Sequence, residues 1–128
     1  MARKKSPTLT EAELRLMDVL WAKRSATVGE VLSGLPENTA LAYSTVLTTL
    51  RILEQKGYVT HSESGRAFVY QPLVGREEAR RSATQQLVRR FFDNSPGLLA
   101  LSLLEQENID ERELERLKAL IERSTEDG

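Results

Sequence analysis

Three short motifs of the same kind divide this sequence and indicate where helices begin. Each motif is a Thr or Asp followed three residues later by Glu: Thr10 with Glu13, Thr27 with Glu30, and Asp110 with Glu113. In such a capping box the first side chain accepts a hydrogen bond from an unpaired N–H of the first helical turn, and the Glu reaches back to the cap residue. Because each motif precedes apolar residues at helical spacing, the three motifs predict three helix starts.

The apolar residues of the N-terminal half recur at helical spacing in three segments. We expect helices over about residues 11–22, 28–33 and 43–56, with Gly57 ending the third. The residues expected to face inward are Leu14, Met17 and Leu20 or Trp21 in the first helix, Val31, Leu32 and Leu35 in the second, and Val46, Leu50 and Leu53 in the third. The N-terminal half is therefore predicted to be built on three helices.

A β-hairpin is predicted after these helices. Residues 58–61 and 66–71 alternate as strands do, and the Ser-Glu-Ser-Gly segment at 62–65 supplies the turn. The strand residues expected to cover the helices are Val59, Phe68 and Tyr70. Three helices followed by a hairpin are the order of a winged helix-turn-helix domain, whose third helix enters the major groove of DNA. We therefore expect a mainly α fold with a small β-hairpin wing, in which residues 1–75 form a DNA-binding domain.

The third helix is the candidate for reading DNA, because its buried stripe leaves the opposite face available. This face is rich in hydroxyl groups, which suit phosphates and base edges, and it carries Leu47 for a thymine methyl and Arg51 for guanine or phosphate. A plain solvated surface is the alternative, although β-branched Thr is a poor choice for a helix that needs only water around it. The candidate DNA-binding residues are Tyr43, Ser44, Thr45, Leu47, Thr48 and Arg51, with Arg66 on the wing.

Residues 76–128 form a second predicted module, with helices over about 76–92, 97–107 and 111–123. The middle helix has leucines nearly all round, and about 50 residues in three helices lack the surface to bury them within one chain. A second copy, related by a two-fold axis, covers these faces better than the first module would. We therefore expect a homodimer that presents two recognition helices to a palindromic site on double-stranded DNA. The expected interface residues are Leu87, Phe91, Leu98, Leu101, Leu104, Leu114, Leu117 and Ile121.

The distribution of charge supports this division better than the net charge of −1 does. Residues 1–75 hold nine Lys or Arg and seven Asp or Glu, a balance of +2, whereas residues 93–128 hold four and ten, a balance of −6. Phosphate repels the acidic end, so this end is expected to lie away from DNA. Arg3, Lys4 and Lys5 form a basic arm, which is either a solvated terminus or a phosphate contact.

Several classes of function are excluded by what the sequence lacks. It has no cysteine, so it has no disulfides or thiolate metal sites, and its single histidine, His61, cannot build a site of several imidazoles. No apolar run approaches the roughly 20 residues that cross a bilayer, and neither a secretory signal nor a Gly-rich phosphate loop occurs. We expect a cytoplasmic protein without cofactor, metal or membrane insertion, and not an enzyme. A winged-helix module that binds protein partners instead of DNA is the alternative, favoured by the near-neutral charge of residues 1–75.

Four segments in this order and spacing resemble the penicillinase-repressor family, which comprises the BlaI and MecI repressors and copper-responsive relatives. The segments are Leu-Thr-Glu-Ala-Glu at 9–13 with Trp21 after it, the stretch 43–53 beginning Tyr-Ser-Thr-Val, Lys-Gly-Tyr-Val at 56–59, and Arg-Ala-Phe-Val-Tyr at 66–70. The resemblance runs from Leu9 to about Arg123. It implies a homodimeric repressor that binds a palindromic promoter site and silences a resistance or stress operon. The DNA contacts that it implies on the recognition helix map to Tyr43, Ser44, Thr45, Thr48 and Arg51.

This sequence departs from the family in the residues that release repression. In the best-known branch, a protease linked to a membrane sensor cuts an Asn-Phe bond in the dimerisation module. No Asn-Phe pair occurs here, and Ser102-Leu103 stands at the aligned place. The copper-responsive branch binds metal through C-terminal cysteine pairs, which are also missing. The resemblance therefore leaves open the inducing signal and any sensor protease, as well as the operator sequence and the regulated genes.

Overall fold

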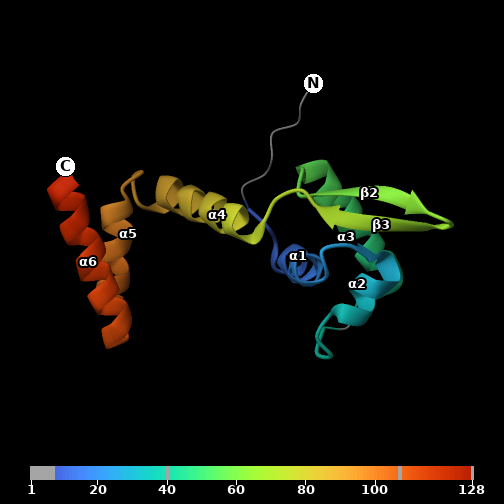
Figure 1. Cartoon of the computed structure of the whole chain (residues 1–128), viewed down its shortest axis with the longest axis horizontal. Helices are drawn as coiled ribbons and strands as arrows, with labels where there is room; N and C mark the ends of the chain where they lie inside the picture. Colours follow the sequence, from blue (N-terminus) through green and yellow to red (C-terminus); the bar gives the residue numbers. More distant parts are fainter. Residues whose placement is uncertain (1–7, 40, 107, 128) are drawn as a thin grey trace, which may run out of the picture. The chain divides into compact units, whose positions relative to one another are not determined.

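The computed structural model describes residues 8–39, 41–106 and 108–127, which form a mainly helical chain with one small sheet (Figure 1). The predicted basic arm at residues 3–5 lies outside the described residues. The elements in chain order are α1 (Glu11–Lys23), β1 (Ala26–Thr27), α2 (Val28–Gly34), α3 (Tyr43–Lys56), β2 (Val59–Ser64), β3 (Ala67–Pro72), α4 (Arg76–Phe91), α5 (Pro96–Gln106) and α6 (Glu111–Asp127).

The helix starts follow the predicted capping residues. The Thr10 hydroxyl accepts a hydrogen bond from the N–H of Glu13 at 3.1 Å, and the Glu13 carboxylate accepts one from the N–H of Thr10 at 2.8 Å. The box that begins at Thr27 forms in the same reciprocal way. At the third motif the Asp110 carboxylate accepts from the N–H of Arg112 at 2.9 Å. Side chains near each start thus satisfy N–H groups that the helix itself leaves unpaired.

The strands form one antiparallel sheet in the order β1–β3–β2. The hairpin of β2 and β3, called the wing below, is longer than predicted, because pairing continues to Ser64 opposite Ala67. Its turn is therefore Gly65-Arg66, and the predicted turn at 62–65 was wrong. Gly65 has a φ of +64°, the positive value that such two-residue turns require. The prediction also missed β1, since a strand of two residues has no periodicity to detect.

One hydrophobic core lies among α1, α2, α3 and the sheet. The predicted stripe of α3 is wholly buried, and Tyr58, Val59 and Tyr70 close the core from the sheet side. Two predictions of burial were wrong. Leu14 is 43% exposed, because the inward side of α1 passes through Leu16 and Leu20 and leaves Leu14 beside it, and Phe68 is 40% exposed near the outer end of the wing.

The chain divides into two compact units, Met1–Gln86 and Leu87–Gly128, so the division falls within α4. The predicted change of module was at residue 76, but the beginning of α4 packs with the first unit. Ala79 belongs to the first core, and the indole Nε1 of Trp21 donates a hydrogen bond to the carbonyl of Val74 at 2.8 Å. The Arg76 guanidinium lies over the Trp21 ring at 5.2 Å from its centroid. These contacts tie the start of α4 to α1.

The second unit contains the end of α4 together with α5 and α6, which lie side by side (Figure 1). The leucine-rich helix α5 buries none of its residues. Asp93 and Asn94, with φ of 50° and 59°, separate it from α4, and the Ser95 hydroxyl caps it by accepting from the N–H of Leu98 at 3.2 Å. Among the described helices, none is both long enough and apolar enough to cross a membrane.

Candidate nucleic-acid interface

Helix α3 has one buried side and one exposed side. Val46, Leu50 and Leu53 are fully buried, and 3.6 residues per turn place Thr48 and Arg51 on the opposite side. All the predicted contact residues of this helix are exposed except Leu47, which is half-buried against the core. The structure therefore gathers Tyr43, Ser44, Thr45, Leu47, Thr48 and Arg51 on the outer half of one helix, with Tyr43 and Leu47 on one flank and Thr45 on the other.

The N-terminus of α3 differs from the starts of α1, α2, α5 and α6. Side chains of Thr10, Thr27, Ser95 and Asp110 accept hydrogen bonds at the starts of α1, α2, α5 and α6. The N-cap of α3 is Ala42, which makes no side-chain cap hydrogen bond. A helix start with unpaired N–H groups and the positive end of the helix dipole attracts anions, phosphate groups among them. This end of α3 thus suits a phosphate oxygen from outside the chain.

The position of α3 is fixed at its far end by an ion pair with α1. The Lys56 ammonium lies 2.7 Å from the Glu13 carboxylate, which is the one that also completes the first capping box. Glu13 is only 4% exposed. Burial by itself raises the pKa of Glu13, but hydrogen bonds from Lys56 and from the N–H of Thr10 outweigh it, so the pKa lies below its ordinary value. The carboxylate therefore stays charged and joins the two helices.

The wing begins in the core and ends in solvent. Tyr70 is buried, whereas Arg66 is exposed in the turn at the outer end. Burial raises the pKa of the Tyr70 hydroxyl, the Glu54 carboxylate raises it further, and the Arg51 guanidinium lowers it. The base of the wing thus lies close to the charged groups of α3.

Two features of this interface escaped the sequence analysis. Gln55 is exposed and follows Arg51 by four residues, so it extends the outer face of α3 by one turn. The i, i+4 spacing was the signal that could have found it. The second feature is a contact between α3 and the wing, in which Nδ1 of His61 lies 2.8 Å from Oε1 of Glu54. No sequence pattern indicates this contact, because it depends on how the hairpin folds onto the helix.

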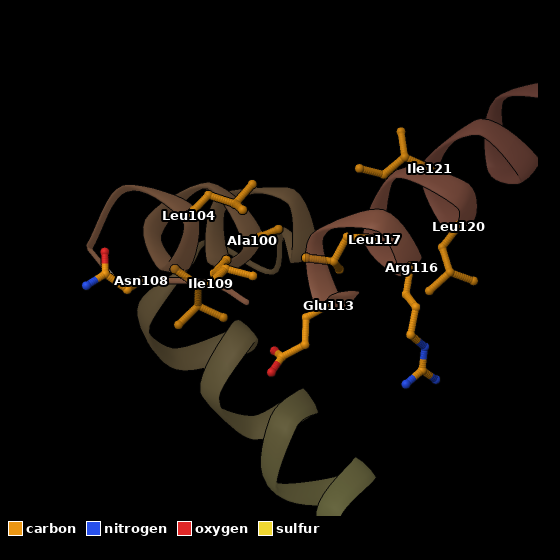
Figure 2. A pocket seen from close by; sticks show the side chains of 10 residues that line it. Ala100, Leu104, Asn108, Ile109, Glu113, Arg116, Leu117, Leu120 and Ile121 are labelled. Carbon is orange, nitrogen blue, oxygen red and sulfur yellow. The ribbon is translucent and has the colours of Figure 1, made fainter. Parts of the chain in front are cut away.

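The residues predicted to join two copies are not buried within the second unit. Leu87, Phe91, Leu98, Leu101, Leu104, Leu117 and Ile121 are exposed, and Leu114 is half-buried. Between α5 and α6 lies an apolar groove of about 590 Å³, lined on its two sides by Leu104 and Leu117 among others. Figure 2 shows Leu117 pointing from α6 towards α5, with Glu113 and Arg116 extending to one edge.

A three-helix unit whose last helix presents an exposed face beside a two-stranded wing has the winged-helix architecture. A solved structure supports this class. The solution structure of the DNA binding domain of the repressor BlaI is 34% identical to this chain, covers 59% of it and 93% of its own length, and superposes with a TM-score of 0.53. The predicted fold class is therefore confirmed.

The comparisons with whole proteins give the family. The family model described as penicillinase repressor matches residues 9–123, which is most of the chain. The penicillinase repressor of Bacillus licheniformis is 29% identical over 119 residues, covering 93% of both chains. The methicillin resistance regulatory protein MecI of Staphylococcus aureus is 20% identical over 117 residues, covering 91% of this chain and 95% of its own. The chain belongs to the penicillinase repressor family, a family of transcriptional repressors and not of enzymes.

Proposed function

We propose that this protein represses transcription by binding double-stranded DNA as a homodimer, at a palindromic operator of a resistance or stress operon. The observation that carries the proposal is the outer face of α3, which is hydroxyl-rich, includes Arg51, and stands beside an exposed wing. The similar protein from Bacillus licheniformis is a penicillinase repressor, which agrees with this function.

In this proposal α3 lies in the major groove with its N-terminus towards a phosphate. The N–H groups near Ala42 and the hydroxyls of Ser44 and Thr48 bind phosphate oxygens or base edges, and these contacts set the register on the duplex. Arg51 donates to guanine or to a phosphate. Arg66, at the wing turn, reaches a phosphate of the neighbouring backbone.

The second unit supplies the pairing of two copies. Its apolar surface includes Phe91, which is 69% exposed, and Leu101, which is 55% exposed. Surfaces of this kind mark interaction sites in proteins. A second copy is the occupant that we propose, because a two-fold interface places the same groove and the same leucines on both sides, and it presents two α3 helices to a palindrome.

The test is retardation of a DNA fragment from around the protein's own gene by the purified full chain. The proposal predicts a retarded complex at low salt, and an affinity that falls by roughly a thousandfold or more between about 50 and about 200 mM salt if six phosphates are contacted. An unrelated fragment of equal length is the control, and it should bind more weakly at every salt concentration. Failure to retard any promoter fragment at low salt would contradict the proposal and favour a winged-helix module for protein partners.

A further inference from the structure

The contact between His61 on β2 and Glu54 on α3 joins the wing to the recognition helix. Nδ1 of His61 lies 2.8 Å from Oε1 and 2.9 Å from Oε2 of Glu54, so one ring nitrogen meets both carboxylate oxygens. A carboxylate only accepts hydrogen bonds, so Nδ1 carries the hydrogen and donates. Charge assistance makes such a hydrogen bond stronger than one between neutral groups.

The surroundings of His61 hold its ring in this orientation. His61 pairs with Tyr70 across the sheet, and the two ring centroids are 5.4 Å apart. The ring of Phe68 meets the imidazole edge-on at 5.0 Å. Tyr70 is buried at the base of the wing and Phe68 stands further out, so aromatic rings flank the imidazole on the face that it shares with them. Ring packing therefore limits how far the His61 side chain can turn away from Glu54.

The position of Glu54 on α3 allows its carboxylate to pair either with His61 on the wing or with Arg51 on the same helix. Glu54 follows Arg51 by three residues, a spacing at which a carboxylate and a guanidinium on one helix readily pair. Arg51 nevertheless makes no ion pair within the described part of the chain, because the carboxylate of Glu54 is turned to the wing. Both groups are close enough to Tyr70 to affect its hydroxyl. Two negatively charged partners, the Glu54 carboxylate and the DNA phosphates, can thus compete for the Arg51 guanidinium.

We infer that His61 is a positioning residue of the DNA interface, which holds the Glu54 carboxylate on the wing and so keeps Arg51 available for DNA. The inference rests on the proposed function. Without the imidazole, the Glu54 carboxylate turns to Arg51 on the same helix, and the guanidinium that is paired in this way is no longer available to the phosphates. The alternative is that His61 only braces the wing mechanically, in which case the charge of Glu54 is irrelevant.

The test is the affinity of five full-length variants for the promoter fragment, including Arg51→Ala alone as a reference. His61→Ala should weaken binding about three- to tenfold, the range expected when one exposed arginine beside an interface is diverted to an ion pair on its own helix. His61→Asn should retain most of the affinity, since the amide nitrogen of Asn takes the place of Nδ1. Glu54→Gln added to His61→Ala should restore binding, because the competing carboxylate is gone. His61→Ala should have little further effect in an Arg51→Ala background.

The outcomes separate this inference from the proposed function. Unmodified protein that binds the fragment, together with a His61→Ala variant that binds equally well, overturns the inference alone. A weakened His61→Ala variant that Glu54→Gln does not restore also overturns it, and shows a mechanical brace. Unmodified protein that binds no promoter fragment overturns the proposed function itself. Thermal unfolding of each variant, measured in parallel, confirms that the winged-helix unit is folded.

Discussion

Helices α3 and α6 both carry apolar residues along one side, but only α3 buries them within the chain. Val46, Leu50 and Leu53 of α3 have no exposed surface. On α6, Leu117 is 37% exposed and Ile121 is 60% exposed. The first unit has a sheet and two other helices to cover α3, whereas the second offers α6 only short helices with exposed leucines of their own. The first unit thus buries the apolar stripe of α3 within itself, whereas the second unit leaves its apolar residues exposed, as the proposed pairing of two copies requires.

The two units should differ most in how much stability is lost when one leucine in each is replaced by alanine. Leu50→Ala removes a fully buried side chain and should lower the free energy of unfolding of the first unit by about 2–5 kcal/mol. Leu101→Ala is the matched change on an exposed site and should lower it by less than about 0.5 kcal/mol. Denaturant unfolding followed by Trp21 fluorescence measures both, and equal losses would remove the contrast between the units.

A charge placed on the surface of α5 should separate the two copies. Leu101→Glu should convert the dimer into a monomer and weaken operator binding by about a hundredfold or more, since two linked half-sites bind much more tightly than one. Gln106→Glu adds the same charge to an exposed site at the end of the same helix and should leave both properties unchanged. Size-exclusion chromatography with light scattering gives the mass. A Leu101→Glu protein that stays fully dimeric would refute the assignment of this surface.

Within the first unit, Glu13→Gln should measure how much the buried carboxylate contributes to stability. Loss of the charged hydrogen bond with Lys56 should lower the free energy of unfolding by about 1–3 kcal/mol at neutral pH. Because the pKa of Glu13 is lowered by folding, this contribution is complete well above 4.5 and is lost as the pH falls below that value. The variant and the unmodified protein should therefore converge in acid. Glu11→Gln, on the exposed side of α1, is the control and should change stability little at any pH.

The smallest expected effect is a loss of DNA affinity without a change in stability or in dimerisation. Arg51→Ala should weaken operator binding about tenfold and leave both the dimer and the unfolding curve unchanged, because Arg51 is exposed and lies outside the buried stripe of α3. Loss of a phosphate contact should also reduce the salt slope by about one unit. Arg15→Ala, an exposed arginine on α1, is the comparison variant. If the two substitutions weaken binding equally, the outer face of α3 is not the DNA contact.

Much of the first unit could be predicted because residues close together in the sequence determine where its helices begin and end. The capping residue Thr10, the stripe through Leu50 and the stop at Gly57, whose φ is +90°, all act within a few residues of chain. The misjudged positions depended on tertiary packing. Leu14 has the right spacing for burial, but the rotation of α1 on the core decides which of its apolar residues face inward.

The candidate site was predictable in part for the same reason. The exposed residues of α3 follow directly from its buried stripe, so they could be named from spacing alone. The wing turn was misplaced because Ser62 and Ser64 have turn-forming side chains, yet cross-strand pairing with β3 extends β2 through both. The contact between Glu54 and His61 joins residues seven apart on different elements, and no periodic pattern encodes such a pair.

The division of labour between the two units is tested most directly by the mass of the protein, alone and on DNA. Sedimentation equilibrium of the unmodified chain at micromolar concentration should give twice the chain mass of 14.4 kDa. Addition of the promoter fragment should give a complex with two chains on each duplex. A single chain of 14.4 kDa in solution that binds the fragment one copy at a time, without cooperativity, would contradict the account.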